Sequence, residues 1–426
     1  MIKKSDKSIG IIGLGYVGLP LAIEFGKIKN TTGYDINANK VQLLQSYNDQ
    51  TGQINRLEFK KSRYLKITNK ISELKKCDIY IVTVPTPVDA NNIPDLSFLT
   101  QATKSVGSIL SKNNIVIFES TVYPGTTEEI CVPILEDSSN LKYNKDFFCG
   151  YSPERVNPGD NKHTLTNITK IVSGSTKNIS SLIYDLYAEI IKAGIFEAKS
   201  IKVAESAKII ENAQRDINIA FINELSMIFS KLKIDTHDVL EAASTKWNFL
   251  NFKPGLVGGH CIGVDPYYLA FKAKEIGVEP EIILSGRKIN NYMSNFITEQ
   301  ICENLKLRKI NLDKSKALLM GLTFKENCLD LRNSKSKDTF MLLKNKGLLV
   351  DIHDPLALEK DIEQEYGQKN IDLKTNSKKY NVIILAVSHQ YYKHIKIENL
   401  KKHLKKEGFV FDVKGILPRN NIVIRL

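Results

Sequence analysis

The residues of this sequence with the clearest potential for chemistry lie around Cys261. They read Gly258-Gly259-His260-Cys261-Ile262-Gly263-Val264-Asp265-Pro266. A thiol between glycines lets a bulky substrate approach the backbone closely, and Asp265 can orient water or a donor beside it. Cys261 is therefore a candidate covalent nucleophile. The alternative is that Cys261 is a small buried apolar residue and that the glycines only make turns.

A second group of polar residues could support that chemistry from a helix. Neither glycine nor proline occurs from 195 to 253, which predicts helices longer than average. Here Lys208, Asn212 and Arg215 follow helical steps and share one face. A thiolate adding to a carbonyl needs a cation or an amide to hold the oxyanion, and Lys208 with Asn212 could supply both. The ammonium would also lower the pKa of the thiol, which is about 8.5 in free cysteine. The alternative is an ordinary solvated face.

The same stretch carries an apolar stripe. Its members recur at spacings close to the helical repeat: Val203, Ala207, Ile210, Ile217, Phe221 and Ile228. We expect this stripe to be buried and the polar group to lie on a different face.

A glycine motif near the start predicts a dinucleotide site. An apolar run at 9–12 leads into Gly13-Leu14-Gly15-Tyr16-Val17-Gly18, and 19–25 has helical patterning. The first glycine permits a tight turn, the second lets a pyrophosphate touch the backbone, and the third allows the helix to pack closely on the strand. The helix N-terminus then attracts the phosphates.

The next strand indicates which dinucleotide binds. Thr31-Thr32-Gly33-Tyr34 ends at Asp35, at about the distance where a carboxylate grips the ribose hydroxyls. Because Asp35 would repel a 2'-phosphate, we expect NAD rather than NADP, although nearby Lys40 weakens that repulsion.

Further strands complete a first sheet. Apolar runs at 79–84, 115–118 and 147–151 alternate with helical stretches such as 96–110, which predicts a parallel, doubly wound sheet. Ligands bind such sheets beyond the C-terminal ends of the strands. The turns expected there are Thr83-Val84-Pro85-Thr86-Pro87, Glu119-Ser120-Thr121-Val122-Tyr123-Pro124-Gly125 and Ser152-Pro153-Glu154-Arg155. Thr121 and Glu154 are thus expected to face the nicotinamide, with plain turn and cap roles as the alternative.

The C-terminal part predicts a second, smaller α/β domain of nucleotide-binding type, without a glycine fingerprint. Strands are expected at 317–321, 348–352, 381–387 and 409–413, and a helix near 338–344. Lys325 and Arg332, in the loop after the first of these strands, are candidates for contact with phosphate or carboxylate. Ordinary surface charge is the alternative.

Composition limits the class of protein. A chain of 426 residues, 42% hydrophobic and 25% charged, is typical of a globular protein with two or three domains. The net charge of +13 is spread over lysine doublets with no long basic run and no interleaved aromatic residues. We therefore expect neither nucleic acid nor membrane as a partner, and the basic excess fits a diphosphate ligand.

Cysteine and histidine usage and the N-terminal run bear on metal and location. The six cysteines include no Cys-x-x-Cys pair and the seven histidines are dispersed, so we expect no metal, and reduced thiols in a cytoplasm. The uncharged run at 8–23, preceded by lysines, imitates a signal peptide or anchor. It contains glycines and a proline and is shorter than the ~20 apolar residues of a spanning helix, so a buried strand and turn explain it better.

Over its whole length the chain resembles the UDP-glucose/GDP-mannose dehydrogenase family. The resemblance rests on Gly-Leu-Gly-Tyr-Val-Gly-Leu-Pro at 13–20, Val84-Pro85-Thr86-Pro87, Glu119-Ser120-Thr121, Ser152-Pro153-Glu154-Arg155, Lys208 with Asn212, Gly-Gly-His-Cys at 258–261, and Gly321-Leu322-Thr323-Phe324-Lys325.

This resemblance implies a four-electron oxidation of a sugar's primary alcohol to a carboxylate, using NAD twice. Cys261 would add to an aldehyde as a thiohemiacetal, a second hydride transfer would leave a thioester, and water would release the uronic acid. The roles it implies are Cys261 as nucleophile, Lys208 and Asn212 holding the oxyanion, Asp265 and Thr121 placing the water, Glu154 near the cofactor and Lys325 near the new carboxylate. It also implies a homodimer through the helix that carries Lys208.

Two departures point to one branch of the family. After the cysteine the UDP-glucose members have Pro-Lys-Asp and this chain has Gly263-Val264-Asp265, and where they place a second acid after Ser-Pro-Glu it has Pro158. An active-site lysine is thus missing. The segment Thr245-Lys246-Trp247-Asn248-Phe249 occupies the region from which those enzymes supply an arginine to the partner subunit.

The departures resemble the branch that oxidises UDP-N-acetylhexosamines for capsules and O-antigens, with UDP-GlcNAc or UDP-GalNAc as substrate. Trp247 is expected to pack in the core, with a contact to the acetyl group or base as the alternative. Rival readings are a UDP-glucose dehydrogenase, a two-electron β-hydroxyacid dehydrogenase that would not need Cys261, and a nucleotide sensor without activity.

The resemblance implies an α/β fold with two Rossmann-like doubly wound domains joined by a long-helix central domain. The expected domains are an NAD-binding domain at 1–200, a central domain with the dimer interface and the cysteine loop at 201–305, and a UDP-sugar-binding domain at 306–426. The expected cofactor contacts are Gly13, Gly15, Tyr16, Val17, Gly18, Asp35, Lys40, Pro85, Thr86, Thr121 and Arg332. The expected substrate contacts are Glu154, Arg155, Lys208, Asn212, Arg215, Phe252, Gly255, Gly258 and Lys325.

Overall fold

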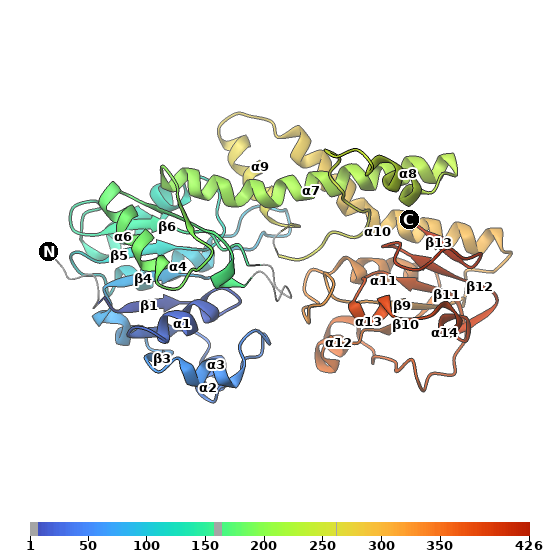
Figure 1. Ribbon diagram of the computed structural model, residues 1–426, viewed down its shortest axis with the longest axis horizontal. Helices are drawn as coiled ribbons and strands as arrows, with labels where there is room; N and C mark the ends of the chain where they lie inside the picture. The colour runs from blue at the N-terminus through green and yellow to red at the C-terminus, as the bar shows by residue number, and fades with distance from the viewer. Residues whose placement is uncertain (1–6, 157–163, 261) are drawn as a thin grey trace. The chain divides into compact units, whose positions relative to one another are not determined.

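The computed structural model describes residues 7–156, 164–260 and 262–426. The chain divides into two compact units (Figure 1). The first comprises Met1–Glu211 with Tyr267–Val278, and the second comprises Asn212–Pro266 with Glu279–Leu426. Helix α7 (Ile201–Leu232) begins in the first unit and ends in the second. Each unit is built around its own sheet.

The first unit contains an eight-stranded sheet, counted over the described residues, in the order β3-β2-β1-β4-β5-β6-β7-β8. Neighbouring strands are parallel except β6 and β7, which are antiparallel. The strands are β1 (Ile9–Ile12), β2 (Thr31–Tyr34), β3 (Leu65–Thr68), β4 (Ile79–Val82), β5 (Ile115–Phe118), β6 (Phe148–Tyr151), β7 (Lys170–Gly174) and β8 (Ile195–Glu197).

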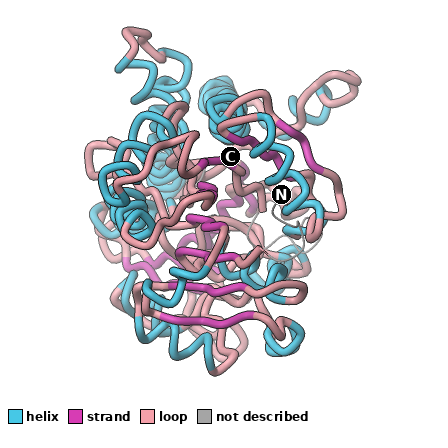
Figure 2. Tube along the Cα trace, turned by 90° about the vertical axis from the view of Figure 1, so that its left-hand side faces the viewer, coloured by secondary structure: helices cyan, strands magenta, loops and turns pink. Residues whose placement is uncertain are grey.

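Helices cover both faces of this sheet, and Figure 2 shows them around its strands. Because successive side chains of a strand point to opposite faces, a strand covered on both sides must be apolar throughout. In β4, Ile79 and Ile81 join one apolar core, while Tyr80 and Val82 join the other. The helices are α1 (Gly18–Gly26), α2 (Ala38–Gln45), α3 (Arg56–Lys61), α4 (Ser97–Gly107), α5 (Val132–Ser139) and α6 (Lys177–Ala188). Most of α9 (Asp265–Glu275) also belongs to this unit, while its first two residues belong to the second.

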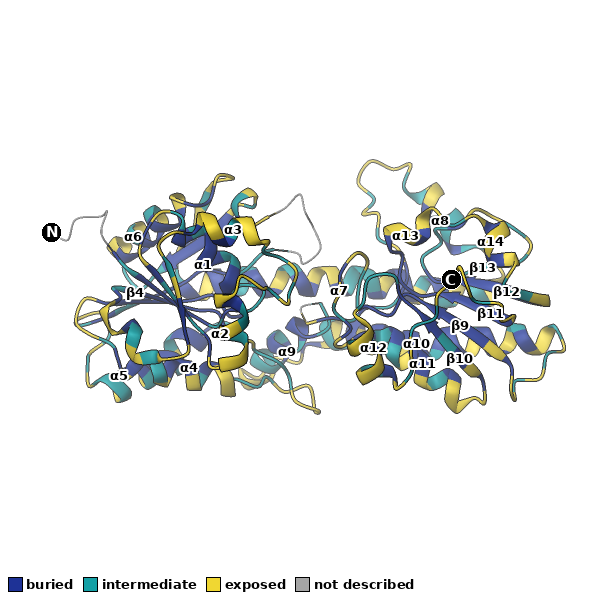
Figure 3. Ribbon diagram, turned by 90° about the horizontal axis from the view of Figure 1, so that it is seen from below, coloured by how far each residue is buried: buried dark blue, intermediate teal, exposed yellow. Residues whose placement is uncertain are grey.

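The second unit has a five-stranded parallel sheet in the order β10-β9-β11-β12-β13, again for the described residues. Its strands are β9 (Lys316–Met320), β10 (Leu349–His353), β11 (Tyr380–Leu385), β12 (Leu404–Asp412) and β13 (Val423–Arg425). Helix α10 (Glu281–Leu307) buries Phe296, Ile297 and Ile301 against one face of the sheet. Its remaining helices are α8 (Thr236–Ala243), α11 (Lys335–Asn345), α12 (Glu359–Tyr366), α13 (Gln390–Lys393) and α14 (Ile397–Lys401). Figure 3 shows the buried strands and the exposed outer surfaces of the helices.

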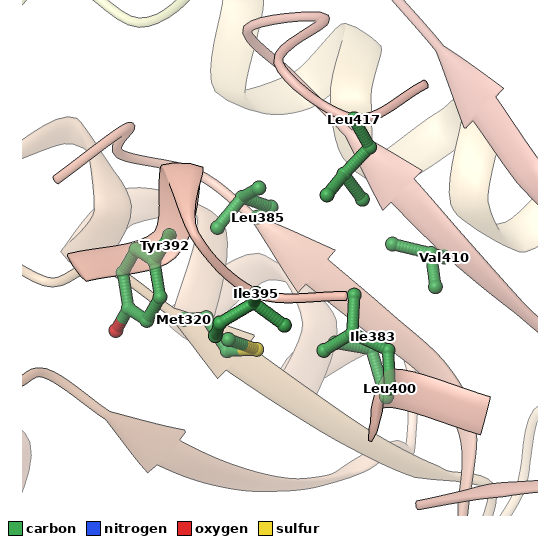
Figure 4. A pocket seen from close by; sticks show the side chains of 8 residues that line it. All are labelled: Met320, Ile383, Leu385, Tyr392, Ile395, Leu400, Val410 and Leu417. Atoms are coloured by element: carbon green, nitrogen blue, oxygen red, sulfur yellow. The ribbon is translucent and has the colours of Figure 1, made fainter. Parts of the chain in front are cut away.

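An apolar cluster in the second unit is core and not a ligand site. Figure 4 shows its side chains, among them Met320, Ile383 and Val410, turned toward one another from β9, β11 and β12. The eight side chains that line the cluster leave no space that a water could occupy.

The predicted fold class is confirmed. The expected strand at 115–118 matches β5, and the expected strands at 317–321 and 348–352 match β9 and β10 within one residue at each end. Strands β3, β7, β8 and β13 were not predicted, because each is short or carries charged residues in its sequence. The three domain boundaries remain a prediction.

The predicted burial of the α7 stripe is wrong. Val203 is 46% exposed, Ile210 55%, Phe221 54% and Ile228 48%. The buried face of the helix instead carries Ala204, Glu205, Lys208, Ile209, Asn212, Ala213, Asp216, Ala220 and Asn223. Four of the six stripe residues therefore lie where the described part of the chain leaves α7 exposed, while Ala207 and Ile217 are half-buried.

Two further expectations about side chains in this region are wrong. Trp247 does not pack in a core, since it is 92% exposed. Arg215 is exposed, whereas Lys208 and Asn212 are buried, so the three do not share an environment. Seven residues make almost two full turns of a helix, so Arg215 lies on nearly the same side of α7 as Lys208 but about two turns further along it, where that side is exposed.

Two simple properties complete the description. Cys77, Cys131, Cys149, Cys302 and Cys328 are buried and free, whereas Cys261 lies outside the described residues. Within the described part of the chain, no helix combines the length and the apolar character needed to span a bilayer.

Candidate active site

The glycine motif forms a tight turn at the end of β1. Gly13 has φ +92°, which favours glycine, and the Thr83 hydroxyl donates to the Gly13 carbonyl at 2.7 Å. A β-carbon on Gly18 would lie 1.8 Å from the Gly13 oxygen, so α1 can pack there only with glycine. A β-carbon on Gly15 would meet nothing within 4 Å. The open space at Gly15 suits the close approach of a pyrophosphate to the backbone.

Replacing Gly18 or Gly15 by alanine should affect stability and NAD binding differently. In Gly18→Ala the methyl group collides with backbone, so we expect a lower thermal midpoint together with lost NAD binding. In Gly15→Ala the methyl group points into open space, so we expect an unchanged midpoint and a Kd for NAD at least about 10-fold higher, a loss of ~1.4 kcal/mol. Calorimetric titration with NAD and thermal unfolding of both variants check this. An equal loss of stability in the two variants would contradict it.

Asp35 lies directly after β2 and is buried. Its carboxylate accepts the Leu14 backbone N–H at 3.0 Å and the Asn37 N–H at 3.0 Å, and Lys40 Nζ lies 2.8 Å from it. The carboxylate is thus fixed against the glycine turn, where a ribose would lie. Lys40 pairs with Asp35 and compensates part of its charge. The preference for NAD over NADP stays a prediction.

The turns after β4, β5 and β6 are braced against one another. The Thr86 hydroxyl donates to the Thr121 carbonyl at 2.6 Å, and the Ser120 hydroxyl donates to the Val84 carbonyl at 2.6 Å. The Tyr151 hydroxyl donates to the Ser120 carbonyl at 3.1 Å. Because parallel strands end at the same edge, these bonds gather the predicted residues Thr86 and Thr121 in one place, beside the exposed Pro85.

The turn after β6 carries the other predicted residues of this edge. Glu154 Oε1 accepts the Arg155 N–H at 2.8 Å and the Val156 N–H, so the carboxylate is turned back onto its own loop. The Arg155 guanidinium pairs with Glu211 at 2.8 Å and donates to the Thr169 carbonyl at 2.8 Å. Pro158, which marks one departure from the family, lies outside the described residues.

A buried carboxylate ties α7 to the segment after Thr121. Glu205 Oε2 accepts the Gly125 N–H at 2.6 Å, and Oε1 accepts the Thr127 N–H at 2.9 Å. Burial raises the pKa of Glu205 to about 7, against the effect of these hydrogen bonds. Lys208, one turn further along α7, is 7% exposed. Glu205 thus couples the start of α7 to the turn that carries Thr121.

The raised pKa of Glu205 predicts how stability varies with pH. An unfolded glutamate titrates near pH 4.3, so the folded chain binds more protons between that pH and 7, and Glu205 makes the fold less stable as pH rises through this window. We expect wild type to lose about 3 kcal/mol relative to Glu205→Gln between pH 5 and 8, several degrees in Tm.

Thermal unfolding of both proteins across this range tests the prediction. Glu129→Gln is the control, because Lys202 and Lys272 lower the pKa of Glu129, so this carboxyl is ionised in both states between pH 5 and 8 and its variant should keep a constant difference from wild type. A constant difference between wild type and Glu205→Gln would contradict the prediction.

In the second unit, two predicted residues meet in a buried pair. Asn212 on α7 and Asp265, the first residue of α9, are 8% and 2% exposed. Asn212 Nδ2 donates to Asp265 Oδ2 at 2.6 Å. This bond turns the Asn212 carboxamide to a defined orientation and holds the carboxylate that follows the cysteine loop. The pair can present both a donor and an acceptor to a reacting carbonyl and its water.

The loop before Cys261 is held by side chains far away in sequence. Asn223 on α7 accepts the Gly255 N–H at 2.8 Å and donates to the Gly255 carbonyl at 3.0 Å. Asn333 donates to the Gly259 carbonyl at 2.7 Å, and its own carbonyl accepts the Gly259 N–H at 3.0 Å. The predicted substrate residues Phe252 and Gly258 lie in this loop and are half-buried. Two amide clamps therefore fix the backbone that leads to the cysteine.

His260 and the predicted Arg332 both lie beside Asp330. His260 Nε2 is 3.6 Å from Asp330 Oδ2, and Arg332 NH2 is 2.6 Å from the same oxygen. Burial alone would raise the pKa of Asp330, but the contact with His260 and the hydrogen bonds from Arg332 outweigh it and lower that pKa. Arg332 lies in the second unit with its side chain 59% exposed, and the structure pairs it with Asp330.

Sequence reasoning missed Lys414, which follows β12 and reaches the loop at Gly255. Its Nζ lies 2.5 Å from the place where a β-carbon on Gly255 would sit. Burial lowers the pKa of Lys414, Glu326 opposes this shift and Lys253 adds to it. The signal was available, because a basic residue at the carboxyl end of a predicted parallel strand lies where α/β domains bind ligands.

Lys325 lies in the loop after β9, on a buried frame. The Thr323 hydroxyl donates to the Lys325 carbonyl at 2.8 Å, and the Asn327 N–H donates to His389 Nδ1 at 2.9 Å. His389 Nε2 is 3.0 Å from Asp354, which also accepts the Leu322 N–H. Because Nδ1 is an acceptor, the ring proton lies on Nε2. A neutral histidine therefore fixes the loop that presents Lys325.

Family comparisons match all three parts of the chain. Residues 7–191 match the NAD binding domain of the UDP-glucose/GDP-mannose dehydrogenase family, 202–292 its central domain and 318–419 its UDP binding domain. The chain belongs to this family. It is therefore an NAD-dependent nucleotide-sugar dehydrogenase.

Individual relatives cover nearly the whole chain. A UDP-N-acetyl-D-glucosamine 6-dehydrogenase of Pseudomonas aeruginosa is 50% identical over 99% of this chain and 100% of its own length. The protein of the same description from Salmonella typhi is 49% identical over 99% of both chains, and Protein CapL of Staphylococcus aureus is 48% identical over 97% and 96%. A solved UDP-D-ManNAc dehydrogenase of Pyrococcus horikoshii superposes with a TM-score of 0.89, at 28% identity over 98% of both chains.

Proposed function

We propose that this family member oxidises the 6-hydroxymethyl group of a UDP-N-acetylhexosamine to the uronic acid, with UDP-GlcNAc as the first candidate substrate. Support for the substrate comes from the Pseudomonas and Salmonella relatives, both named UDP-N-acetyl-D-glucosamine 6-dehydrogenase. The observation that carries the chemistry is the buried hydrogen bond between Asn212 and Asp265, which places a donor and a carboxylate beside the loop of Cys261.

The proposed reaction balances with Cys261 as a covalent carrier. Loss of a hydride and a proton converts the C6 alcohol to an aldehyde, and the Cys261 sulfur then bonds to C6 to give a thiohemiacetal. Loss of a second hydride and a proton leaves a thioester, and water breaks the C–S bond to release the carboxylate, a proton and the thiol. When bound, NAD accepts the hydride of each oxidation.

Each proposed role follows from what a side chain can donate or accept. Lys208 and Asn212 hold the oxyanion that forms when sulfur or water adds to C6. Asp265 and Thr121 place the hydrolytic water, and the bond from Asn212 keeps Asp265 oriented for it. Glu154 lies near the cofactor. These assignments use the chain's own residues and do not need the lysine that UDP-glucose members place after the cysteine.

The diphosphate of the substrate is assigned to Lys414 of the second unit, which follows β12 and lies beside Gly255. Lys325 follows another strand of the same parallel sheet and keeps its role near the new carboxylate. Burial and the neighbouring Lys253 lower the pKa of Lys414, because both disfavour its charged form. A polyanionic ligand beside Lys414 would favour the charged form again. The match of 318–419 to a UDP binding domain supports the assignment.

A count of NADH formed per sugar tests this function. At saturating NAD we expect two NADH per UDP-GlcNAc consumed, with UDP-GalNAc and UDP-glucose as comparison substrates. One NADH per sugar would indicate a two-electron enzyme and would demote Cys261 to a structural residue. Activity with UDP-glucose alone would move the chain to the hexose branch.

We further propose a homodimer through α7, for a cytoplasmic enzyme that supplies uronic acid for capsule or O-antigen. The exposed stripe of Val203, Ile210, Phe221 and Ile228 supports the interface, because a contiguous apolar helix face is rarely left in water. Phe221→Lys with Ile228→Lys should convert the dimer to monomer in sedimentation velocity. An unchanged dimer in this double variant would exclude α7 as the interface.

A further inference from the structure

A buried cluster of charge in the first unit has no part in the proposed reaction. Lys170, the first residue of β7, has a side chain that is 4% exposed, and that of Glu119, directly after β5, is 0% exposed. Lys170 Nζ donates to Glu119 Oε2 at 2.6 Å. The Tyr187 hydroxyl of α6 donates to the other oxygen, Glu119 Oε1. Both carboxylate oxygens are thus bonded inside the protein.

The same ammonium also holds the turn that carries Glu154. Lys170 Nζ donates to the Pro153 carbonyl at 3.1 Å and lies 4.0 Å from Glu154 Oε2. An ammonium has three N–H donors, so one side chain can serve these partners together. Lys170 therefore connects the end of β5, two residues before Thr121, with the end of β6, one residue before Glu154.

Stability alone does not account for this arrangement. Removing two charges from water costs several kcal/mol per ion, and apolar side chains of similar volume often stabilise a fold as well or better. Burial raises the pKa of Glu119, Lys170 opposes that rise and Glu154 adds to it, so the cluster keeps two carboxylates close to one ammonium. What the ion pair supplies is a fixed geometry between two turns.

We propose that Lys170 is a positioning residue, which sets the place of the Glu154 turn relative to the Thr121 turn through Glu119 and the Pro153 carbonyl. The proposal rests on the roles given to Thr121 and Glu154 in the proposed function. Without the brace both turns keep their own hydrogen bonds, but their separation is no longer fixed. A misplacement of about 1 Å in a catalytic group can cost on the order of 100-fold in rate.

The test replaces the ion pair by a neutral pair. Lys170→Met with Glu119→Gln removes both charges and leaves an oxygen to accept from Tyr187. We expect kcat for NADH formation with UDP-GlcNAc to fall about 100-fold, while KM for NAD and for the sugar change less than about 3-fold. The thermal midpoint should stay near that of wild type. Lys170→Met alone should have a lower midpoint than the double variant, because it leaves Glu119 buried without its cation.

A control ion pair with a buried lysine is available in the same unit. Lys29 pairs with the exposed Glu189 at 2.7 Å, and it precedes β2, at the opposite end of the strands from the turns. Lys29→Met with Glu189→Gln should leave kcat unchanged. Equal losses of kcat in the two double variants, or full kcat in the Lys170 double variant, would overturn the proposal. If wild type forms two NADH per sugar and the Lys170 double variant is fully active, the positioning role fails and the proposed function stands. If the wild-type protein forms fewer than two NADH per sugar, the proposed function itself is wrong.

Discussion

Cys261→Ser is expected to stop uronic acid formation, with kcat reduced at least about 1,000-fold. A serine hydroxyl is almost fully protonated at neutral pH and is a much weaker nucleophile than a thiolate. The second oxidation needs an adduct at C6, so its hydride would no longer be released. Rapid-quench analysis of sugar products, with the count of NADH, measures the loss. NAD binding by calorimetric titration should be unchanged.

Cys302→Ser supplies the matched control for the thiol. Cys302 is a buried cysteine on α10, so the substitution makes the same chemical change in the core of the second unit. We expect it to lower the thermal midpoint slightly and to leave kcat intact. Full turnover in Cys261→Ser would instead indicate a two-electron enzyme that uses only the helix lysine.

The first sheet could be predicted because its central strands can be recognised from their own residues. In a parallel sheet covered on both faces, strands such as β4 and β5 are continuous apolar runs. The glycine turn was equally readable, since a positive φ at Gly13 and the contact at Gly18 permit almost no other residue. Such features depend on a few neighbouring residues.

The orientation of α7 could not be predicted from its pattern. Periodicity reveals which face of a helix is apolar, but it does not say what covers that face. Here the chain packs the polar face of α7 inward, where Lys208 and Asn212 lie, and leaves Phe221 and Ile228 exposed. A solvated face and an active-site face look alike in sequence, because both are polar.

The braces of the candidate site depend on the tertiary fold. Asn223 and Gly255 are 32 residues apart, and Lys170 and Glu119 are 51 apart. Nothing in the local sequence of either pair indicates its partner. In the sequence, Lys170 is a charged residue, and lysine side chains are usually solvated. Its place in the core is shown by its contacts with Glu119 and Pro153, which depend on the tertiary fold.

Asn212→Asp is expected to reduce kcat about 1,000-fold at pH 8, and to recover part of that loss as pH falls. The substitution is isosteric, but it replaces the donor of the 2.6 Å bond to Asp265 with a second carboxylate in a buried site. Two carboxylates this close cannot both ionise, so the apparent pKa of the pair rises. Above that pKa the oxyanion would face added negative charge instead of an amide donor, a loss of the size seen when one oxyanion donor is removed, ~3–4 kcal/mol.

Below the raised pKa the two carboxyl groups share a proton. The protonated group can then donate to Asp265 as the carboxamide does, so kcat relative to wild type should rise as pH falls through that value. Asn304→Asp on α10, where the amide donates to the Gln300 carbonyl, makes the same change away from this pair and should follow the wild-type profile. Asn212→Ala cannot share a proton, so its loss should be independent of pH. A pH-independent loss in Asn212→Asp as well would mean that Asn212 only packs against Asp265, and would remove it from the proposed oxyanion site.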